Sequence, residues 1–288
     1  MTAQPAASKM TLPELAAMRA RGDRIVMVTA YDAPSGRLAD DAGVDIVLVG
    51  DSAGTTVLGG TSTVPVTLDE MLVFTRGVVR GVSHALVIAD MPFGSYQVSD
   101  AAALEHAIRL VKEGGADGVK LEGAGATLTR IAAIVDAGIP VMGHIGLTPQ
   151  SATLLGGYRA QGRTADAARR LIDDARALER AGAFAIVLEA IPAIVAERVT
   201  AEIGVPTIGI GAGASCCGQV LVWHDLLGLT RGSTPRFVKR YADLDGVIAG
   251  ALDAFVQDVR GGTFPGPDHT YGMPDTEREK LDDAKVER

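Results

Sequence analysis

The sequence predicts a single α/β domain folded as a closed (β/α)8 barrel, with an extra helix before the first strand. The chain has 288 residues, which suits one barrel, and 47% of them are hydrophobic, which is enough for a large core. Eight short runs rich in Val and Ile recur without alternating polar residues, a pattern typical of parallel strands buried on both faces. Helical patterns separate most of these runs, so the strand count favours a TIM barrel over an open, doubly wound sheet.

The predicted elements alternate along the chain. The strands are expected at residues 25–29, 45–49, 85–89, 118–121, 140–143, 185–188, 206–210 and 220–223. The helices are expected at residues 35–42, 68–82, 101–113, 126–137, 165–181, 193–202 and 247–256. An amphipathic pattern at residues 11–21 predicts the extra helix, which we expect to close the bottom of the barrel. Only residues 214–218 separate the last two strands, so the seventh crossover is expected to be shortened or distorted.

The domain is predicted to span residues 1–288, with flexible ends at about residues 1–8 and 272–288. From about Gly261 onward the chain becomes polar and charged, and this tail is expected to be irregular. Thr67 and Glu70 form a capping-box pattern, which marks the start of one predicted helix. The capping box therefore supports a helix within the domain.

Composition limits the function classes. The formal net charge of −8 argues against a nucleic-acid binder, which needs clustered Lys and Arg. No uninterrupted apolar stretch approaches the roughly 18 residues of a membrane span, and residues 1–10 lack the pattern of a secretion signal. The two cysteines, Cys216 and Cys217, are adjacent and form no disulfide framework. We therefore expect a cytoplasmic protein without nucleic-acid or membrane partners.

Four acidic residues stand at the carboxyl ends of predicted strands two, three, four and six. They are Asp51, Asp90, Glu122 and Glu189. The carboxyl ends of all barrel strands open onto one face, where active sites lie, so these side chains are expected to converge. An acidic residue after a strand can instead cap the next helix, as we expect of Asp100. Loop residues follow three of the four, which weakens that alternative for Asp51, Asp90 and Glu122.

A bound cation would relieve the repulsion among converging carboxylates. Hard oxygen ligands favour Mg²⁺, or Mn²⁺, over softer metals. Asp51, Asp90 and Glu122 come from adjacent strands, so we expect them to share one ion. Glu189 lies two strands further round and is expected to act as a general base.

Lys120 lies two residues before Glu122, so both side chains point to the same face of their strand. A charge in an apolar strand needs a partner, and three readings remain open for Lys120: a structural ion pair, a binding site for a substrate carboxylate, or a Schiff-base nucleophile. Neighbouring carboxylates favour a protonated amine. His144 ends the fifth strand, and it is predicted to line the site, with a core position as the alternative.

Several longer motifs occur in a fixed order between about Lys9 and Tyr271. They are Thr29-Ala30-Tyr31-Asp32, Val49-Gly50-Asp51-Ser52, Asp90-Met91-Pro92-Phe93-Gly94-Ser95-Tyr96, Lys120-Leu121-Glu122-Gly123, Gly143-His144-Ile145-Gly146-Leu147-Thr148-Pro149-Gln150 and Gly209-Ile210-Gly211-Ala212-Gly213. With these motifs the chain closely resembles the ketopantoate hydroxymethyltransferase family. Two departures stand out: Cys217 replaces the family's usual Asp, and Ala124 stands where a second Gly often follows the Glu-Gly pair.

The resemblance implies a (β/α)8 barrel that transfers a hydroxymethyl group from 5,10-methylenetetrahydrofolate to 3-methyl-2-oxobutanoate. The product is 2-dehydropantoate, on the route to pantothenate and coenzyme A. The resemblance implies that Asp51, Asp90 and Glu122 bind Mg²⁺, and that Glu189 is the general base. It also implies that Ser52 and Lys120, with Asp51 and Asp90, bind the 2-oxo acid, and that the chain forms a homo-oligomer, as a decamer in many members.

Three other functions remain as alternatives. A magnesium barrel acting on phosphoenolpyruvate or isocitrate-like acids typically carries a Lys-Cys-Gly-His segment, which this sequence lacks. A class I aldolase would use Lys120 as its nucleophile. A binding module with an inactive site is disfavoured by the four carboxylates.

Overall fold

The structure, a computed structural model, describes residues 8–232 and 234–283. Its internal contacts divide the chain into two compact units, residues 1–241 and 242–288, whereas the sequence predicts one domain over residues 1–288. We describe each unit by itself. The predicted flexible ends, residues 1–8 and 272–288, lie partly outside the described residues.

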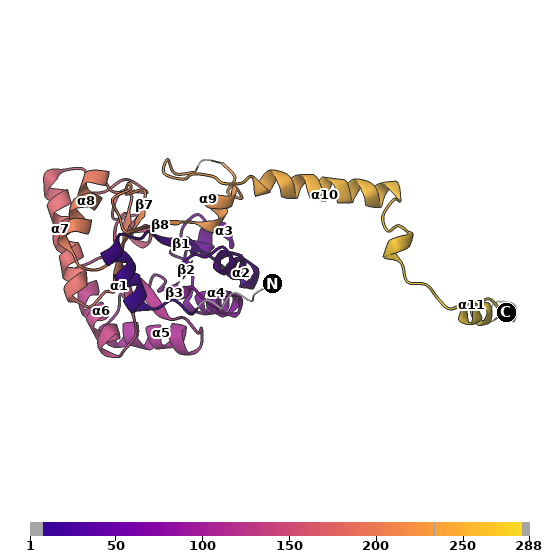
Figure 1. Ribbon diagram of the computed structural model, residues 1–288, viewed down its shortest axis with the longest axis horizontal. Coiled ribbons are helices and arrows are strands. Elements are labelled where there is room, and N and C mark those ends of the chain that lie inside the picture. The colour runs from indigo at the N-terminus through magenta and orange to yellow at the C-terminus, as the bar shows by residue number, and fades with distance from the viewer. Residues whose placement is uncertain (1–7, 233, 284–288) are drawn as a thin grey trace. The chain divides into compact units, whose positions relative to one another are not determined.

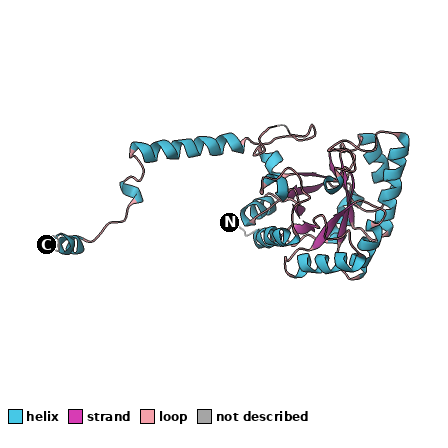
Figure 2. Cartoon of the chain, turned by 180° about the vertical axis from the view of Figure 1, so that it is seen from behind, coloured by secondary structure: helices cyan, strands magenta, loops and turns pink. Residues whose placement is uncertain are grey.

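The first unit is a closed barrel of eight strands in which every neighbouring pair is parallel (Figures 1 and 2). The strands are β1 (Ile25–Thr29), β2 (Ile46–Val49), β3 (Leu86–Asp90), β4 (Gly118–Glu122), β5 (Val141–Gly146), β6 (Ala185–Glu189), β7 (Thr207–Ile210) and β8 (Gly218–Leu221). The predicted (β/α)8 barrel is thus confirmed. The last strand was predicted two residues too late, because the apolar run continues into Trp223, which begins a helix.

Helices surround the strands, as Figure 2 shows in cyan around magenta. The helices of this unit are α1 (Leu12–Arg21), α2 (Ala33–Asp41), α3 (Ala53–Thr56), α4 (Leu68–Gly81), α5 (Asp100–Lys112), α6 (Thr127–Asp136), η1 (Pro149–Ser151), α7 (Ala165–Arg180), α8 (Ala193–Glu202) and α9 (Trp223–Leu227). The fully described stretch 211–217 joins β7 to β8 without a helix, so the predicted short crossover is confirmed.

Alternation along each strand separates two apolar clusters. On β4, Val119 and Leu121 belong to the cluster packed under the helices. Ile88 of β3, Met142 of β5 and Val187 of β6 belong to the other cluster, which fills the barrel. Because strand side chains alternate with a period of two, a residue two places after an inner residue also points inward.

Helix α1 closes one end of the barrel interior, as the sequence predicts. Thr11 caps it by accepting a hydrogen bond from the backbone N–H of Glu14. Leu15 is buried and belongs to the inner cluster, together with Ile25 at the start of β1. The apolar side of α1 therefore covers the end of the barrel where the strands begin.

The second unit contains α10 (Leu244–Gly261), η2 (Pro267–His269) and α11 (Asp275–Asp283). The prediction of an irregular tail is wrong for α11. This short helix has acidic residues in its first turn, and an ion pair of 2.7 Å joins Lys280 Nζ to Glu277 Oε1 one turn away. No helix in the described part of the chain is long and apolar enough to cross a membrane.

Candidate active site

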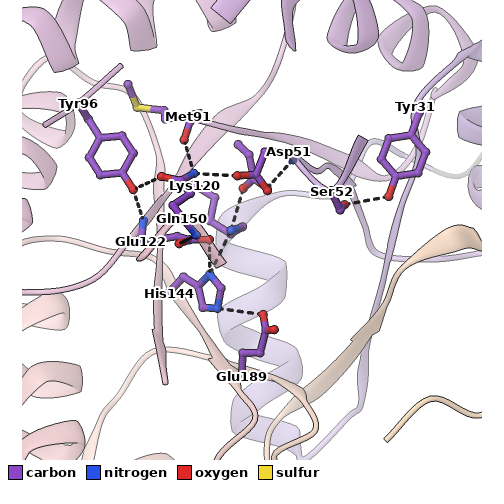
Figure 3. A network of polar contacts seen from close by, with 11 residues as sticks. Tyr31, Asp51, Ser52, Met91, Tyr96, Lys120, Glu122, His144, Gln150 and Glu189 are labelled. Atoms are coloured by element: carbon purple, nitrogen blue, oxygen red, sulfur yellow. Dashed lines mark hydrogen bonds and ion pairs between the residues drawn. The ribbon is translucent and has the colours of Figure 1, made fainter. Parts of the chain in front are cut away.

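The carboxyl ends of β2 to β6 bring the predicted site residues together (Figure 3). Asp90, His144 and Glu189 each lie two residues after an inner apolar residue, so their side chains also point into the barrel. The strand pairing sets Asp90 beside Lys120 and Glu122 beside His144. The acidic residues of different strands thus share one rim.

These polar side chains are buried although they are charged. The exposed fraction of each is at most 6% for Asp51, Asp90, Lys120, Glu122 and His144. Lys120 Nζ lies 2.8 Å from Asp90 Oδ1 and 3.3 Å from His144 Nδ1. Buried charges persist only where partners offset their lost hydration, so this cluster has to be internally balanced or bind a ligand.

Gly50 lets the end of β2 approach the network. A Cβ at this position would lie 2.6 Å from Ser52 Oγ, so any larger residue would displace the Ser52 hydroxyl. The backbone N–H of Asp51 consequently donates to Asp90 Oδ2 at 3.0 Å. Ser52 Oγ lies 2.9 Å from the hydroxyl of Tyr31, which accepts a hydrogen bond from Thr29 Oγ1 at 2.9 Å.

Gln150 connects residues of three strands. Its side-chain amide donates to Asp51 Oδ2 and to the Met91 carbonyl oxygen, both at 2.9 Å. Its backbone N–H donates to Glu122 Oε2 at 3.0 Å, and its amide oxygen accepts from the Tyr96 hydroxyl at 2.6 Å. Sequence reasoning did not single out Gln150 or Tyr96, although both stand in motifs that carried the family resemblance.

The electrostatics of the pocket favour added positive charge. Burial is the largest influence that raises the pKa of Asp51 well above its usual value, and the charges of Asp90 and Glu122 raise it further. Burial lowers the pKa of Lys120, but the same carboxylates outweigh burial and raise it. The Lys120 amine is therefore protonated at neutral pH.

His144 lies between two carboxylates. Its Nδ1 is 3.4 Å from Glu122 Oε1, and its Nε2 is 3.3 Å from Glu189 Oε2. Burial and Lys120 lower the pKa of His144, but Glu122 and Glu189 outweigh them and raise it to about 9. A protonated imidazole then forms an ion pair with each carboxylate, although Nε2 makes no hydrogen bond to a described residue.

Glu189 is more open than its neighbours, with 15% of its side chain exposed. Gly146 permits this end of β5 to pass beside it, because a Cβ there would lie 2.2 Å from the Glu189 carbonyl oxygen. Ala190 follows with φ of 48°, the one left-handed residue other than glycine in the described chain. Backbone strain of this kind costs about 1 kcal/mol or more and gathers at functional sites.

The fit of a divalent cation depends on these same atoms. In the described residues, no group of three or more His, Cys, Asp or Glu side chains is arranged to hold a metal ion as it stands. Lys120 and Gln150 instead bind carboxylate oxygens. With all groups ionised, however, four carboxylates face only two cations, Lys120 and His144. A divalent cation would cancel that excess, and the all-oxygen donors suit Mg²⁺.

The glycine motif after β7 lies against another surface. Gly211 and Gly213 line a cavity of about 570 Å³ with Arg24 and Phe237, and none of the predicted site residues lines it. Cys217, the departure from the family pattern, donates its backbone N–H to Thr207 Oγ1 at 3.2 Å. The glycine motif and Cys217 thus contact residues other than the buried carboxylates.

A parallel (β/α)8 barrel with buried acid–base groups at the carboxyl rim defines the class of barrel enzymes. The family model described as ketopantoate hydroxymethyltransferase matches residues 9–267. This chain belongs to that family, whose members are transferases.

Relatives support this family assignment, and solved structures support the fold. The chain is 58% identical over 264 residues to a 3-methyl-2-oxobutanoate hydroxymethyltransferase of Moorella thermoacetica, covering 92% of this chain and 98% of the relative. It is 54% identical to the enzyme of the same name from Heliobacterium modesticaldum, covering 93% and 98%. A crystal structure of 2,3-dimethylmalate lyase aligns with a TM-score of 0.59 at 18% identity, covering 97% of this chain and all of the other, and supports the fold alone.

Proposed function

We propose that this enzyme transfers a hydroxymethyl group from 5,10-methylenetetrahydrofolate to 3-methyl-2-oxobutanoate, giving 2-dehydropantoate for pantothenate synthesis. The observation that carries the proposal is the buried cluster of carboxylates, Lys120 and His144 at the barrel rim of a family member. Relatives that share more than half of their residues carry the name of this activity.

In the proposed site, Asp51, Asp90 and Glu122 hold Mg²⁺. The bound ion would supply Lewis-acid stabilisation of negative charge on the keto oxygen. The support is the donor chemistry and the raised pKa of Asp51, which reflects first its burial and then the charges of Asp90 and Glu122.

In the proposed site, Lys120 and Ser52 bind the 2-oxo acid. Lys120 is protonated and buried, so it can pair with the substrate carboxylate. Ser52 Oγ offers a further hydrogen bond beside Asp51. The same protonation argues against a Schiff base, because an amine must lose its proton before it attacks a carbonyl.

Glu189 takes the proton from C3 of the substrate. Its position next to His144 fixes its orientation, and its partial exposure leaves an oxygen accessible from the pocket. The electron pair of the broken C–H bond forms the enolate. Water breaks both C–N bonds of the folate's methylene bridge, which gives tetrahydrofolate and a one-carbon unit at the formaldehyde level. The enolate carbon adds to the carbonyl carbon of that unit, and the alkoxide formed takes up the proton released from C3, which gives the hydroxymethyl product.

The test is formation of 2-dehydropantoate from 3-methyl-2-oxobutanoate and 5,10-methylenetetrahydrofolate, with and without a metal chelator. We expect product that disappears with chelator and returns with Mg²⁺. Product formation unaffected by chelator would remove the metal from the proposal, and no product would reject the function. Trapping of Lys120 by borohydride with substrate would instead identify a class I aldolase.

The cytoplasmic location and the homo-oligomer, a decamer by family likeness, are proposed with this function. Small molecules, the 2-oxo acid and the folate, are the proposed binding partners.

A further inference from the structure

A cavity of about 870 Å³ opens on the barrel beside the proposed active site. Tyr31, Trp223, His224, Arg76 and Arg80 are among the residues that line it. A second cavity of about 370 Å³ is lined by Ser52 and shares His224 with the first, as well as Thr56 and Leu229. Shared lining residues make the two cavities adjoin.

The smaller cavity begins at the substrate end. Ser52 directly follows Asp51, and its hydroxyl contacts that of Tyr31, which borders the larger cavity (Figure 3). The combined space therefore leads away from the buried carboxylates toward the outer surface of α4. Its volume is in the range of about 300–1,000 Å³ that ligand pockets occupy.

The outer end carries unpaired positive charge. Arg76 and Arg80 are exposed and lie one turn apart on α4, on the same side of the helix. Neither guanidinium forms a hydrogen bond or ion pair with any residue that the structure describes. The two residues lie about 6 Å apart along the helix axis, and two guanidiniums without a hydrogen bond to a described residue suit a ligand with more than one carboxylate.

The inner end is aromatic and lacks one hydrogen-bond partner. The rings of Tyr31 and His224 lie 5.4 Å apart, and Trp223 is adjacent in sequence. The Nδ1 atom of His224 is buried without a hydrogen-bond partner among the described residues. The residue His224 lines both cavities, so its ring, with those of Tyr31 and Trp223, makes the inner end suited to a flat aromatic group.

We propose that these adjoining cavities bind the one-carbon donor, a folate, with its heteroaromatic head beside Tyr31, Trp223 and His224 and its glutamate carboxylates on Arg76 and Arg80. This inference rests on the proposed function. A folate has a flat aromatic head that carries the reactive methylene carbon and a tail of one or more glutamates. From Ser52 to α4 the cavities present first aromatic rings and then guanidiniums, which is the order of the aromatic head and the glutamate tail in a folate.

The first experiment measures binding without turnover. Trp223 is the only tryptophan of the chain, so its fluorescence reports on this cavity alone. Titration of the full-length enzyme with 5-formyltetrahydrofolate, which carries no transferable methylene, is expected to quench this fluorescence saturably. The double variant Arg76→Gln/Arg80→Gln is expected to raise the apparent Kd about tenfold, the combined scale of two partly exposed ion pairs.

A matched control lies on the neighbouring helix. Arg37 is exposed on α2 but does not line the cavity, so Arg37→Gln removes a positive charge outside the cavity and should leave the Kd unchanged. Raised salt should weaken binding to the wild type more than to the double variant. Absence of saturable quenching, or an equal Kd in the wild type and the double variant, would overturn the proposal.

The second experiment separates this subsite from the proposed function. Exchange of the C3 hydrogen of 3-methyl-2-oxobutanoate with D₂O needs the base but no folate, and it should be unchanged in the double variant. The KM for 5,10-methylenetetrahydrofolate should rise about tenfold, like the Kd. Turnover with an unchanged KM would reject the subsite while the function stands. Arginine-dependent folate binding without any product would reject the function while the subsite stands.

Discussion

The buried charges in the candidate site are stabilised by neighbouring side chains. His144 bridges Glu122 and Glu189, while Lys120 pairs with Asp90, so removing one side chain leaves another charge without its partner. Conservative substitutions that keep the shape are therefore the sharpest tests at this scale.

Glu189→Gln tests the general base. We expect turnover to fall at least about 100-fold, because the amide cannot accept the C3 proton. Binding of the 2-oxo acid should survive, since Lys120 and Ser52 remain. Steady-state kinetics measure the first effect and calorimetry the second. Glu197→Gln, on the exposed side of α8, is the control, and near-normal turnover of Glu189→Gln would reject the assignment.

Asp51→Ala and Asp90→Ala test the proposed metal site. Each variant should weaken binding of 3-methyl-2-oxobutanoate when Mg²⁺ is present, because the carboxylates would no longer hold the ion. Titration calorimetry with and without Mg²⁺ checks this. Asp100→Ala, in the first turn of α5, should keep the affinity of the wild type. Equal affinities in all four proteins would contradict the metal assignment.

Gln150→Leu tests a positioning role outside the proposed ligands. The variant loses the amide contacts to Asp51 and Met91 but keeps a similar volume. We expect Mn²⁺ affinity, followed by electron paramagnetic resonance, to fall about 10-fold or more. Gln161 is half-buried and, among the described residues, its side-chain amide bonds only to the Arg159 carbonyl oxygen, so Gln161→Leu should bind Mn²⁺ normally. An unchanged affinity in a folded Gln150→Leu protein would limit Gln150 to a packing role.

At the scale of elements, Asp40 joins the end of α2 to the segment before β3. Its carboxylate accepts backbone N–H bonds from Ser83, His84 and Ala85, and it lies 3.0 Å from His84 Nδ1. Burial opposes the charge, but these donors hold the pKa of Asp40 below its usual value. The contacts connect two layers of the barrel through one side chain.

Asp40→Asn should lower the free energy of unfolding by about 2 kcal/mol at pH 7, the scale of hydrogen bonds to a charged group. The folded-state pKa lies below the unfolded value, so the stabilisation is complete above the unfolded pKa, about 4, and is lost as the pH falls through the lower folded value. Urea unfolding at pH 7, 5 and 3 measures this difference. A difference between Asp40→Asn and wild type that grows toward low pH would contradict it.

At the scale of the whole molecule, the second unit exposes a row of apolar side chains. Ile248, Leu252, Phe255 and Val259 of α10 are each between 46% and 58% exposed, at spacings of four, three and four residues. This spacing makes one apolar stripe on the helix, which a soluble chain normally covers. The stripe is consistent with the proposed homo-oligomer.

Leu252→Asp/Phe255→Asp should therefore reduce the molar mass in solution. Light scattering should give several times the 29.8-kDa chain mass for the wild type, ten times for a decamer, and less for the variant. Gln257→Asp adds one negative charge elsewhere on α10 and should keep the wild-type mass. A monomeric wild type would reject the oligomer.

The sequence by itself determined the barrel and the convergence of its acidic residues. Eight apolar runs define the strands, and the period of two places Asp90, Glu122 and Glu189 on the inner face at one rim. These are local properties of the chain, so they can be read without coordinates. Local signals also predicted the capping box of Thr67 and Glu70, which the structure contains.

The tertiary structure alone decided which distant groups meet. The contact from Gln150 to Asp51 spans 99 positions, and Asp40 reaches residues more than 40 positions away. Trp223 and Arg80 line the same cavity although they lie far apart in the sequence. Such contacts depend on how separate elements pack, and no local pattern of residues encodes that packing.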